Sequence, residues 1–362
     1  MNKENEGPEI AIIGPYPPPY GGISVHIQRV LDYLDELKNN YDFYLENRVK
    51  GNFNVPPHNK FYGLDKIKYL FQLLFKDYFL IHHHSPDWKT RVLLSFYGML
   101  GKSVYLHIHG ASLRDTIEKG GIKSFLTKKF LKFVNIIADN SDIAQLAQKY
   151  RPKSVVVIDA FLPPLFREDI FERFIAEYGR VLQNKDYVIS MVGWFNYYGG
   201  EDLYGFDIAL KALQKFKKEV EKNVLLLASI NGVRSEDLHE KVKKYISNNN
   251  LNKNVFFIYE ELPEIWPIYL VSDVFIRPTC SDGSALSVEE ALWFETPVIA
   301  SNAVPRPKGV YLFQNRSADD LYENLRKLYF SRYGYRDVKE KIDRVKNKKF
   351  TYELFSKIYK LR

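Results

Sequence analysis

The sequence is poor in cysteine, with Cys280 the only one among 362 residues. A single cysteine cannot form a disulfide bond within the chain, and it cannot supply the cysteine pairs of a structural zinc site. A disulfide-stabilised secreted scaffold is therefore excluded. The default expectation is a reducing, cytoplasmic setting.

Long apolar runs are also missing. No stretch approaches the ~18 uninterrupted apolar residues that are needed to span a bilayer. Residues 1–9 are polar and acidic, and the apolar run at residues 10–13 is short, so neither the basic flank nor the length of a signal peptide is present. We therefore expect neither a membrane span nor a leader.

Several nucleotide-binding motifs are absent. Gly14, Gly21 and Gly22 follow the first predicted strand without G-x-G-x-x-G spacing, which disfavours a nicotinamide dinucleotide site. Residues 101–103 resemble the end of a P-loop, but Phe96 replaces the first glycine of that motif. The Asp-x-Asp motif that many metal-dependent sugar transferases use occurs nowhere, so any nucleotide chemistry is expected to be independent of metal.

Three consecutive histidines, at residues 82–84, suggest a metal site at first sight. Successive strand residues point to opposite faces, so at most His82 and His84 converge, and no acidic residue has an obvious ligand spacing to them. We therefore predict no metal site.

The composition is that of a folded globular protein, with 46% hydrophobic and 27% charged residues. The length predicts two to three domains. The formal net charge is +8, and basic segments at residues 1–165 and 331–362 flank an acidic middle. A basic protein can bind nucleic acid, but no nucleic-acid-binding motif occurs, so we predict no such partner.

A basic segment runs from Lys119 to Phe133 and contains no acidic residue. Its apolar residues have helical spacing and predict an amphipathic helix, with an apolar face at Ile122, Phe125, Leu126, Phe130 and Phe133. Its lysines would crowd the remaining surface, at Lys119, Lys123, Lys128, Lys129 and Lys132. Two interpretations stay open, a helix on an anionic membrane and an ordinary packed helix with a solvated face.

Short apolar runs rich in β-branched residues alternate with helix-length segments, an order typical of parallel sheets covered by helices. Eleven strands are predicted, at residues 9–13, 78–83, 103–107, 134–138, 154–158, 187–192, 224–229, 255–258, 273–276, 297–301 and 309–312. These are too many for one compact sheet. The predicted fold class is therefore α/β with two doubly wound halves, joined by a linker at residues 161–164.

Residues 273–301 are the most informative stretch. They predict a strand, a loop of small residues at 279–285, a helix to about Phe294 and another strand. A small-residue loop lets a ligand approach the backbone, and the free N–H groups of the following helix suit a phosphate. Asp282 lies in the loop and Glu290 lies about two turns into the helix. These carboxylates could hold hydroxyls on the two sugars of a nucleotide sugar.

The same stretch resembles the signature of the retaining glycosyltransferases of family 4, which share the two-domain GT-B fold. That signature has two Glu residues separated by seven residues, with glycine after the first and alanine after the second. Asp282-Gly283 and Glu290-Ala291 match it, with Asp in place of the first Glu. Other segments also resemble the family, namely the Gly21-Gly22 loop, residues 106–110, Val192-Gly193 and residues 204–207.

The resemblance implies a GT-B architecture, in which two Rossmann-like doubly wound parallel-sheet domains face a central cleft. The acceptor-binding N-terminal domain is expected at residues 1–165 and the nucleotide-sugar-binding domain at residues 166–335. Helices within residues 336–362 are expected to cross back to the first domain.

The resemblance also implies site residues. His109 would contact a sugar hydroxyl near the reacting carbon, Asp282 would bind the donor sugar, and Glu290 would bind the ribose hydroxyls. The remaining donor-binding positions are main-chain groups, at Gly283, Ser284, Ala285 and Leu286 for the phosphates and sugar, and at Gly21 and Gly22 in the N-terminal loop.

Two residues depart from the family pattern. Trp194 and Tyr204 stand where the family has cations that bind the diphosphate. A diphosphate that leaves without cations loses electrostatic stabilisation of several kcal/mol. We expect Arg277 and Arg306 to replace these cations, with Arg234 and Lys308 as further candidates.

By resemblance, the chain would transfer a sugar with retention from a nucleoside diphosphate sugar, without a cofactor, to a glycan or lipid-linked glycan in surface polysaccharide biosynthesis. The departing phosphate would help to deprotonate the acceptor. The basic flanks fit a peripheral position on the inner face of the cell membrane. Two alternatives stay open, a GT-B protein that binds nucleotide sugars without turnover and a nucleotide-sugar epimerase.

Overall fold

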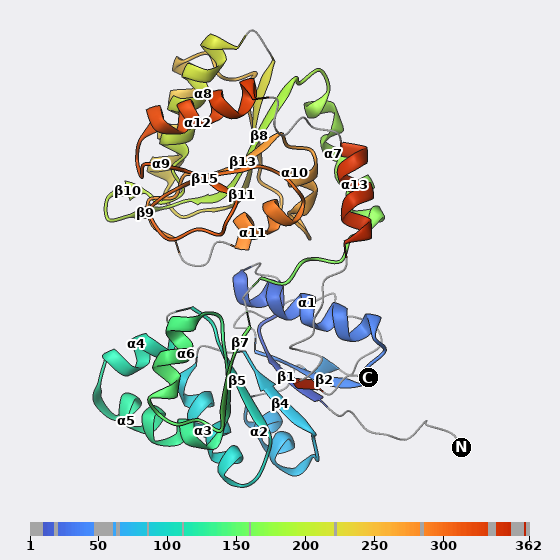
Figure 1. The fold of residues 1–362 in the computed structure, drawn as a ribbon, viewed down its shortest axis with the longest axis vertical. Helices are drawn as coiled ribbons and strands as arrows, with labels where there is room; N and C mark the ends of the chain where they lie inside the picture. The colour runs from blue at the N-terminus through green and yellow to red at the C-terminus, as the bar shows by residue number, and fades with distance from the viewer. Residues whose placement is uncertain are drawn as a thin grey trace. The chain divides into compact units, whose positions relative to one another are not determined.

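The computed structural model describes residues 10–17, 21–46, 61–62, 66–84, 87–110, 112–158, 161–220, 223–282, 286–331, 338–348 and 358–359. The chain divides into two compact units (Figure 1). The first unit consists of Met1–Leu165 and Phe350–Arg362, and the second consists of Phe166–Lys349.

The first unit is built on a seven-stranded sheet in which every pair is parallel. The strand order is β3-β2-β1-β4-β5-β6-β7. The strands are β1 (Ile10–Gly14), β2 (Tyr41–Leu45), β3 (Phe61–Tyr62), β4 (Leu80–His83), β5 (Val104–Ile108), β6 (Asn135–Ala138) and β7 (Ser154–Val157). The order reverses between β1 and β4, and the carboxyl ends of strands at such a switch point are the usual place for a ligand.

Helices cover both faces of this sheet. Helix α1 (Gly22–Glu36) packs on one face through Ile27, Leu31 and Leu34. The other helices are α2 (Lys66–Phe75), α3 (Trp88–Met99), α4 (Ser112–Glu118), α5 (Gly121–Phe130), η1 (Leu131–Phe133) and α6 (Ser141–Gln148). Of these, α2, α3, α4, η1 and α6 contribute to the core on the opposite face.

The second unit contains a six-stranded parallel sheet of order β12-β11-β8-β13-β14-β15 and a small β10-β9 hairpin. The strands of the sheet are β8 (Tyr187–Phe195), β11 (Val224–Val233), β12 (Val255–Ile258), β13 (Val274–Arg277), β14 (Val298–Ser301) and β15 (Val310–Phe313). The hairpin consists of β9 (Tyr197–Tyr198) and β10 (Glu201–Asp202).

Two helical layers also cover the second sheet. Helices α8 (Phe206–Glu219), α9 (Glu236–Asn248) and α12 (Ala318–Phe330) share one large core. On the other face lie α7 (Glu168–Leu182), α10 (Trp266–Leu270), α11 (Leu286–Trp293) and α13 (Val338–Asn347). The carboxyl ends of β8, β13 and β14 meet at one edge of the sheet, where the predicted donor site lies.

All eleven predicted strands are present, within one or two residues at their starts. The predictions missed β2, β3 and the β9–β10 hairpin. Strand β2 was missed because Asp42 interrupts its apolar pattern, although this carboxylate is buried and accepts a hydrogen bond from the Tyr78 hydroxyl. Within the described residues, no helix has both the length and the apolar composition required to cross a bilayer.

The C-terminal boundary differs from the prediction. Residues 338–349, which were expected to leave the second domain at residue 335, belong to the second unit. The buried Lys341 amine donates to the Ser272 carbonyl at 2.8 Å and holds α13 there. Only residues 350–362 belong to the first unit, where the Tyr359 hydroxyl lies 2.5 Å from His82 Nδ1.

Candidate active site

Asp282 lies at the centre of a charged cluster in the second unit. Arg277, the last residue of β13, donates to it from Nε to Oδ2 and from Nη2 to Oδ1, both at 3.0 Å. This is the bidentate geometry that orients a guanidinium most strongly. Arg277 also donates from Nη1 to the Val192 carbonyl of β8 at 3.2 Å. The edge of the sheet therefore fixes both charged groups.

Arg306, which follows β14, contacts the same carboxylate. Its Nη1 donates to Asp282 Oδ2 at 2.9 Å, and its Nε donates to the carbonyl of Ser301 at the end of β14 at 3.1 Å. The Thr279 hydroxyl donates to Asp282 Oδ2 at 3.1 Å. The side chain of Arg306 is only 2% exposed. Two guanidinium groups thus face one carboxylate, which leaves a local excess of positive charge.

The charges of this cluster shift the pKa values of its members. Burial alone would raise the pKa of Asp282, but hydrogen bonds from Arg277 and Arg306 and the charges of these arginines hold it below its ordinary value. Burial alone would lower the pKa of Arg277, but Asp282 raises it above its ordinary value. Asp282 and Arg277 are therefore ionised at neutral pH. The cluster can attract an anion, whereas Asp282 is a poor general base.

An arginine stacks on each of the two aromatic residues that replace the expected cations. The guanidinium carbon of Arg234 lies 4.7 Å from the centroid of the Trp194 ring, and that of Arg277 lies 5.2 Å from the centroid of the Tyr204 ring. Both are cation–π distances. Positive charge is therefore present beside both Trp194 and Tyr204. It comes from Arg234, which follows β11, and from Arg277 at the end of β13.

Glycines let these aromatic rings lie directly on the sheet. A Cβ atom on Gly193 would lie 2.7 Å from the Tyr204 ring, and one on Gly232 would lie 2.3 Å from the Trp194 ring. Gly205 has a positive φ of 71° at the start of α8, and a Cβ atom there would lie 2.1 Å from the Pro278 carbonyl oxygen. These glycines therefore determine where the two stacked arginines lie.

Glu290 lies in α11, as the sequence predicts, and its side chain is buried. The Tyr269 hydroxyl donates to Glu290 Oε2 at 3.2 Å. Tyr269 comes from α10 and was not predicted from sequence, because no local pattern connects it to α11. Leu286 is the first residue of α11. The predicted main-chain groups of Gly283, Ser284 and Ala285 lie outside the described residues.

The predicted glycines of the first unit lie at the start of α1. Gly21 is the N-cap residue and Gly22 is the first helical residue. The Ser24 hydroxyl accepts from Gly21 N at 3.0 Å and lies 3.1 Å from Gly21 O. A Cβ atom on Gly21 would meet no atom closer than 3.9 Å. The backbone therefore remains accessible at this helix N-terminus.

His109 follows β5 and is held by two groups. Its Nδ1 lies 3.3 Å from Asp139 Oδ1, and its Nε2 lies 3.1 Å from His84 Nδ1. Its side chain is 9% exposed. Burial would raise the pKa of Asp139, but hydrogen bonds from His107 and His109 hold it far below its ordinary value. Asp139 was not predicted, although its place just after β6, the neighbour of β5, could have suggested it.

More histidines surround His109 than the spacing predicted. Sequence spacing predicts at most a pair, His82 and His84, and the structure corrects this expectation because α1 and β5 bring three further imidazoles to the same place. One nitrogen atom from each of His26, His84, His107 and His109 lies within 4.8 Å of the others, close enough for a metal ion. Burial lowers the pKa of His84 well below its ordinary value and that of His107 to about 4, so both are neutral at pH 7.

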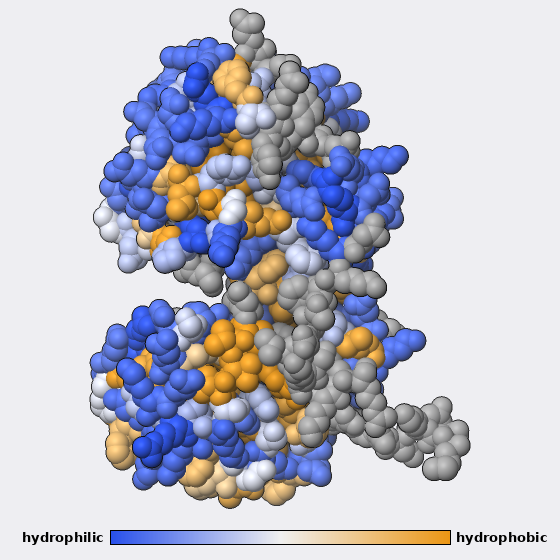
Figure 2. Space-filling view, in the orientation of Figure 1, coloured by the Kyte–Doolittle hydropathy of each residue, from blue (hydrophilic) through white to orange (hydrophobic). Residues whose placement is uncertain are grey.

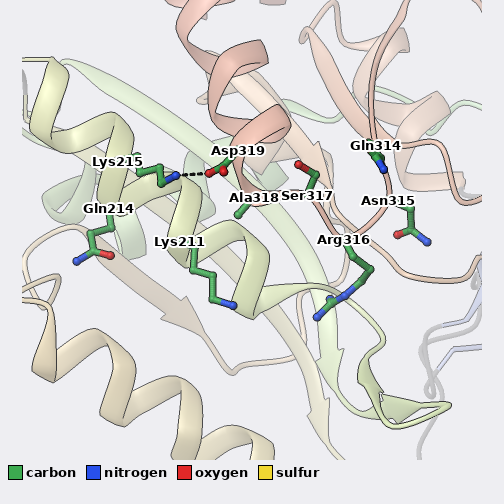
Figure 3. A pocket seen from close by; sticks show the side chains of 9 residues that line it. All are labelled: Lys211, Gln214, Lys215, Gln314, Asn315, Arg316, Ser317, Ala318 and Asp319. Carbon is green, nitrogen blue, oxygen red and sulfur yellow. Dashed lines mark hydrogen bonds and ion pairs between the residues drawn. The ribbon is translucent and has the colours of Figure 1, made fainter.

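A separate surface depression of about 540 Å³ lies in the second unit (Figure 3). Its lining comes from α8 and from the segment that leads into α12, at Lys211, Gln214, Lys215, Gln314, Asn315, Arg316, Ser317, Ala318 and Asp319. Lys215 pairs with Asp319, and Arg316 donates to Asp207 at 2.6 Å. These opposite charges compensate one another within the protein, and no predicted site residue lines the depression.

Comparisons with known proteins agree with this fold. Residues 180–345 match the family model of the glycosyl transferases group 1, and no curated protein matches the chain significantly in sequence. The chain is similar to HepE of Anabaena in complex with UDP, at 14% identity and a TM-score of 0.62 over 93% of each chain. HepE has also been crystallised with UDP-glucose.

Two further solved structures are similar over almost the whole chain. A glycosyltransferase from Rickettsia africae is 15% identical, with 98% of each chain covered and a TM-score of 0.63. WaaG, a glycosyltransferase involved in lipopolysaccharide biosynthesis, is 11% identical over 97% of this chain and 98% of its own, with a TM-score of 0.61. The predicted α/β GT-B fold is confirmed. The stretch that matches the family model, residues 180–345, lies within the second unit.

Proposed function

We propose that the chain is a retaining, metal-independent glycosyltransferase that takes a sugar from a nucleoside diphosphate sugar. The observation that carries this proposal is the pair of guanidinium groups, Arg277 and Arg306, around Asp282 at the edge of the matched domain. Preorganised cations aimed at the place where negative charge develops are typically the largest contribution to such catalysis. The two guanidinium groups exceed the single negative charge of Asp282, and this excess positive charge stabilises the diphosphate as it leaves.

The reaction breaks the bond between the anomeric carbon and the diphosphate oxygen. The acceptor oxygen forms its new bond on the same face of the sugar, and its proton passes to the departing phosphate. Arg277, Arg306 and Arg234 stabilise the diphosphate, Glu290 binds the ribose, and Asp282 binds a sugar hydroxyl while it orients both arginines. His109 contacts a sugar hydroxyl near the reacting carbon. No divalent metal is required, because guanidinium groups provide the positive charge.

The nucleotide is best sought first among uridine diphosphates. HepE, which shares the fold, has been crystallised with UDP and UDP-glucose. A screen of UDP, GDP, dTDP and their sugars by thermal shift, in EDTA, tests the donor site. We expect one nucleotide family to raise the melting temperature, and we expect Glu290→Ala to abolish this shift. Glu289→Ala, which alters the neighbouring acid of the same helix, is the matched control.

Product analysis separates the proposed transfer from its two alternatives. A transferase releases the nucleoside diphosphate only as it glycosylates an added acceptor, whereas an epimerase changes the sugar without release. A protein that only binds, as Trp194 and Tyr204 would allow, shows a thermal shift with neither product. Binding without turnover over a broad set of glycan and lipid-linked acceptors would overturn the proposed activity.

The acceptor side of the proposal rests on the surface of α5. Sequence left open whether the apolar residues of this helix pack inside the protein or lie on a membrane. Ile122 and Phe125 are 70% and 60% exposed, whereas Ser124 and Thr127 are buried. The Ser124 hydroxyl donates to the Ile117 carbonyl of α4 at 2.8 Å, which helps to hold this face of α5 against the protein. Exposed apolar side chains among lysines are the pattern of a helix that lies on an anionic membrane.

Neighbouring helices extend this apolar surface. Hydrophobic side chains are exposed on α2 and α3, at Phe71, Phe75, Phe96 and Met99, and Figure 2 shows orange hydrophobic residues among blue hydrophilic ones on the first unit. We therefore propose that the first unit contacts an anionic membrane that displays a lipid-linked glycan acceptor, in surface polysaccharide biosynthesis. The lysines of α5 would contribute about 1 kcal/mol each near such a surface.

Vesicle sedimentation tests this surface. At low salt we expect stronger binding to vesicles that contain anionic phospholipid than to neutral ones, and we expect Ile122→Ser with Phe125→Ser to weaken it. Phe330→Ser, which changes a residue of similar exposure in the second unit, should have no effect. Equal binding to anionic and neutral vesicles would remove the membrane from the proposal and leave the donor chemistry untouched.

A further inference from the structure

The histidines of the first unit meet at one point from three separate elements. His26 belongs to α1, His84 follows β4, and His107 and His109 lie at the end of β5. The rings of His107 and His109 are stacked, with centroids 4.1 Å apart, and the ring of His26 lies edge-on to His107 at 4.9 Å. One nitrogen from each of the four imidazoles lies within 4.8 Å of the other three.

One pair already has the separation of two ligands on one metal ion. Zn–N bonds are about 2.0–2.1 Å long, so two nitrogens on a tetrahedral zinc lie roughly 3.3 Å apart. His84 Nδ1 and His109 Nε2 are 3.1 Å apart. Since all four nitrogens lie within 4.8 Å of one another, the other pairs have to approach by up to about 1.5 Å, which rotations of the imidazole rings can provide.

Asp139 orients two of these imidazoles as a carboxylate does behind metal-bound histidines. Its Oδ1 lies 3.1 Å from His107 Nε2 and 3.3 Å from His109 Nδ1, and its Oδ2 accepts from Gly110 N at 3.1 Å. An ionised carboxylate only accepts hydrogen bonds, so both histidine nitrogens donate. The lone pairs are then on His107 Nδ1 and His109 Nε2, which is the arrangement seen when a carboxylate supports a histidine ligand.

The surroundings also suit a metal ion. His26, His84 and His107 are buried, so water competes little for the site, and the partly exposed His109 gives a route of entry. Imidazole binds a metal ion in its neutral form. Four nitrogens with no thiolate suit zinc, copper or nickel rather than magnesium or calcium.

We propose that His26, His84, His107 and His109 form a binding site for one transition-metal ion, with Zn²⁺ as the first candidate and Asp139 as a positioning residue. This site replaces the expectation, drawn from sequence spacing, that the chain has no metal site. It does not rest on the proposed function. One consequence does depend on the proposed function. A metal ion bound to His109 Nε2 would prevent that atom from contacting a donor sugar, so we expect bound zinc to inhibit transfer.

Cobalt substitution tests the site without any sugar substrate. The full chain is purified without a histidine tag, treated with EDTA, dialysed and titrated with Co²⁺. We expect one Co²⁺ per chain and the intense visible absorption of a four-coordinate ion, which Zn²⁺ then displaces. If the wild-type chain shows only the weak absorption of a six-coordinate ion, or no saturable binding of Co²⁺, the proposal is overturned without recourse to any variant.

Variants then locate the ion. His84→Gln and, separately, His26→Asn should remove the four-coordinate spectrum, and Asp139→Asn should weaken Zn²⁺ binding by about 10- to 100-fold. His239→Gln is the matched control, because this buried histidine lies in the second unit and contacts the Tyr259 hydroxyl at 2.8 Å. Circular dichroism confirms that each variant is folded. An unchanged spectrum in His84→Gln and His26→Asn, or its loss in His239→Gln, would place the ion elsewhere and refute the site.

Discussion

Arg234 is the residue at which the electrostatics of the donor site can be tested with the least structural damage. Its side chain is exposed and stacks on Trp194, so its removal leaves the core intact. A hydrogen bond to a charged group contributes about 1.5–3 kcal/mol, which corresponds to roughly 10- to 100-fold in affinity. We expect Arg234→Ala to weaken binding of the nucleoside diphosphate by that factor, as measured by calorimetry.

The matched control is Arg173→Ala, which removes another exposed arginine of the same unit from α7. Both variants should keep the melting temperature of the wild type without ligand. Equal nucleotide affinity in Arg234→Ala and wild type would exclude Arg234 from the diphosphate site, and the stack on Trp194 would then be a surface contact only.

Two glycines give opposite predictions for the same substitution. At Gly205 an alanine would have a positive φ of 71° and a Cβ atom 2.1 Å from the Pro278 carbonyl oxygen. Strain of this kind costs about 1–3 kcal/mol, so Gly205→Ala should be destabilising. Gly179 lies inside α7 with ordinary contacts, and Gly179→Ala should be stabilising by about 0.5–1 kcal/mol.

Urea denaturation followed by circular dichroism measures both effects. Gly205→Ala should also weaken nucleotide binding, because Pro278 follows Arg277 directly and any shift there moves the Asp282 cluster. If Gly205→Ala unfolds at the same urea concentration as wild type, the close approach of the loop to Pro278 is absent in solution.

At the scale of elements, the connection between β10 and α8 makes the stability of the fold depend on pH. Asp202 is buried, and burial raises its pKa to about 6, although its carboxylate accepts from the backbone N–H groups of Tyr204, Gly205 and Asp207. Its pKa in an unfolded chain is about 3.9. Because the folded value is higher, Asp202 contributes stability that is full below about pH 4 and is lost as the pH rises through 6.

Two pKa units correspond to about 3 kcal/mol. Asp202→Asn cannot ionise, so its free energy of unfolding relative to wild type should rise by about this amount between pH 4 and pH 7, as measured by urea denaturation at each pH. Asp319→Asn, an exposed change in the same unit, provides the baseline. A constant difference between Asp202→Asn and wild type over this range would show that Asp202 keeps an ordinary pKa.

Helix α3 depends on a glycine for its contact with η1. A Cβ atom on Gly98 would lie 2.3 Å from the Phe133 carbonyl oxygen and 3.0 Å from a Val134 methyl group. Since a backbone atom cannot yield as a flexible side chain can, Gly98→Ala should cost about 1–3 kcal/mol, the usual range for overpacking. The melting temperature should therefore fall in Gly98→Ala, and a value equal to that of wild type would contradict the close packing.

The contrast between strands and helix α5 shows what local sequence encodes. Strand β5 has apolar residues at Val104, Leu106 and Ile108 in a short run that ends near a glycine, and this pattern is sufficient to locate it. Helix α5 has apolar residues at helical spacing as well, yet it exposes Ile122 and Phe125 and buries Ser124, whose hydroxyl donates to the Ile117 carbonyl of α4. This contact with a neighbouring helix is a tertiary property that no pattern within α5 expresses.

The candidate site divides in the same way. Asp282 and Glu290 belong to one continuous stretch, so a motif identified them, and Arg277 and Arg306 followed from their places at neighbouring strand ends. Asp139, Tyr269 and His26 come from distant segments and meet the site only after folding. Their positions depend on strand order, which the alternation of strands and helices does not specify.

For the whole molecule, catalysis without metal makes a simple prediction. In protein already freed of transition metal, transfer activity should be the same in buffer with EDTA as in buffer with Mg²⁺, because the arginines around Asp282 already provide the positive charge at the diphosphate. Initial rates at saturating donor measure this. A rate that falls in EDTA and recovers with Mg²⁺ would mean that the arginines are insufficient.

The division of the chain has a consequence for its synthesis. The second unit is one continuous segment, so it can fold as soon as residues 166–349 have left the ribosome. The first unit needs Ile358 and Tyr359, which are buried in its core beside His82. Both residues follow the whole second unit in the sequence. A nascent chain that stalls after residue 349 therefore holds a finished second unit and a first unit whose core is still incomplete.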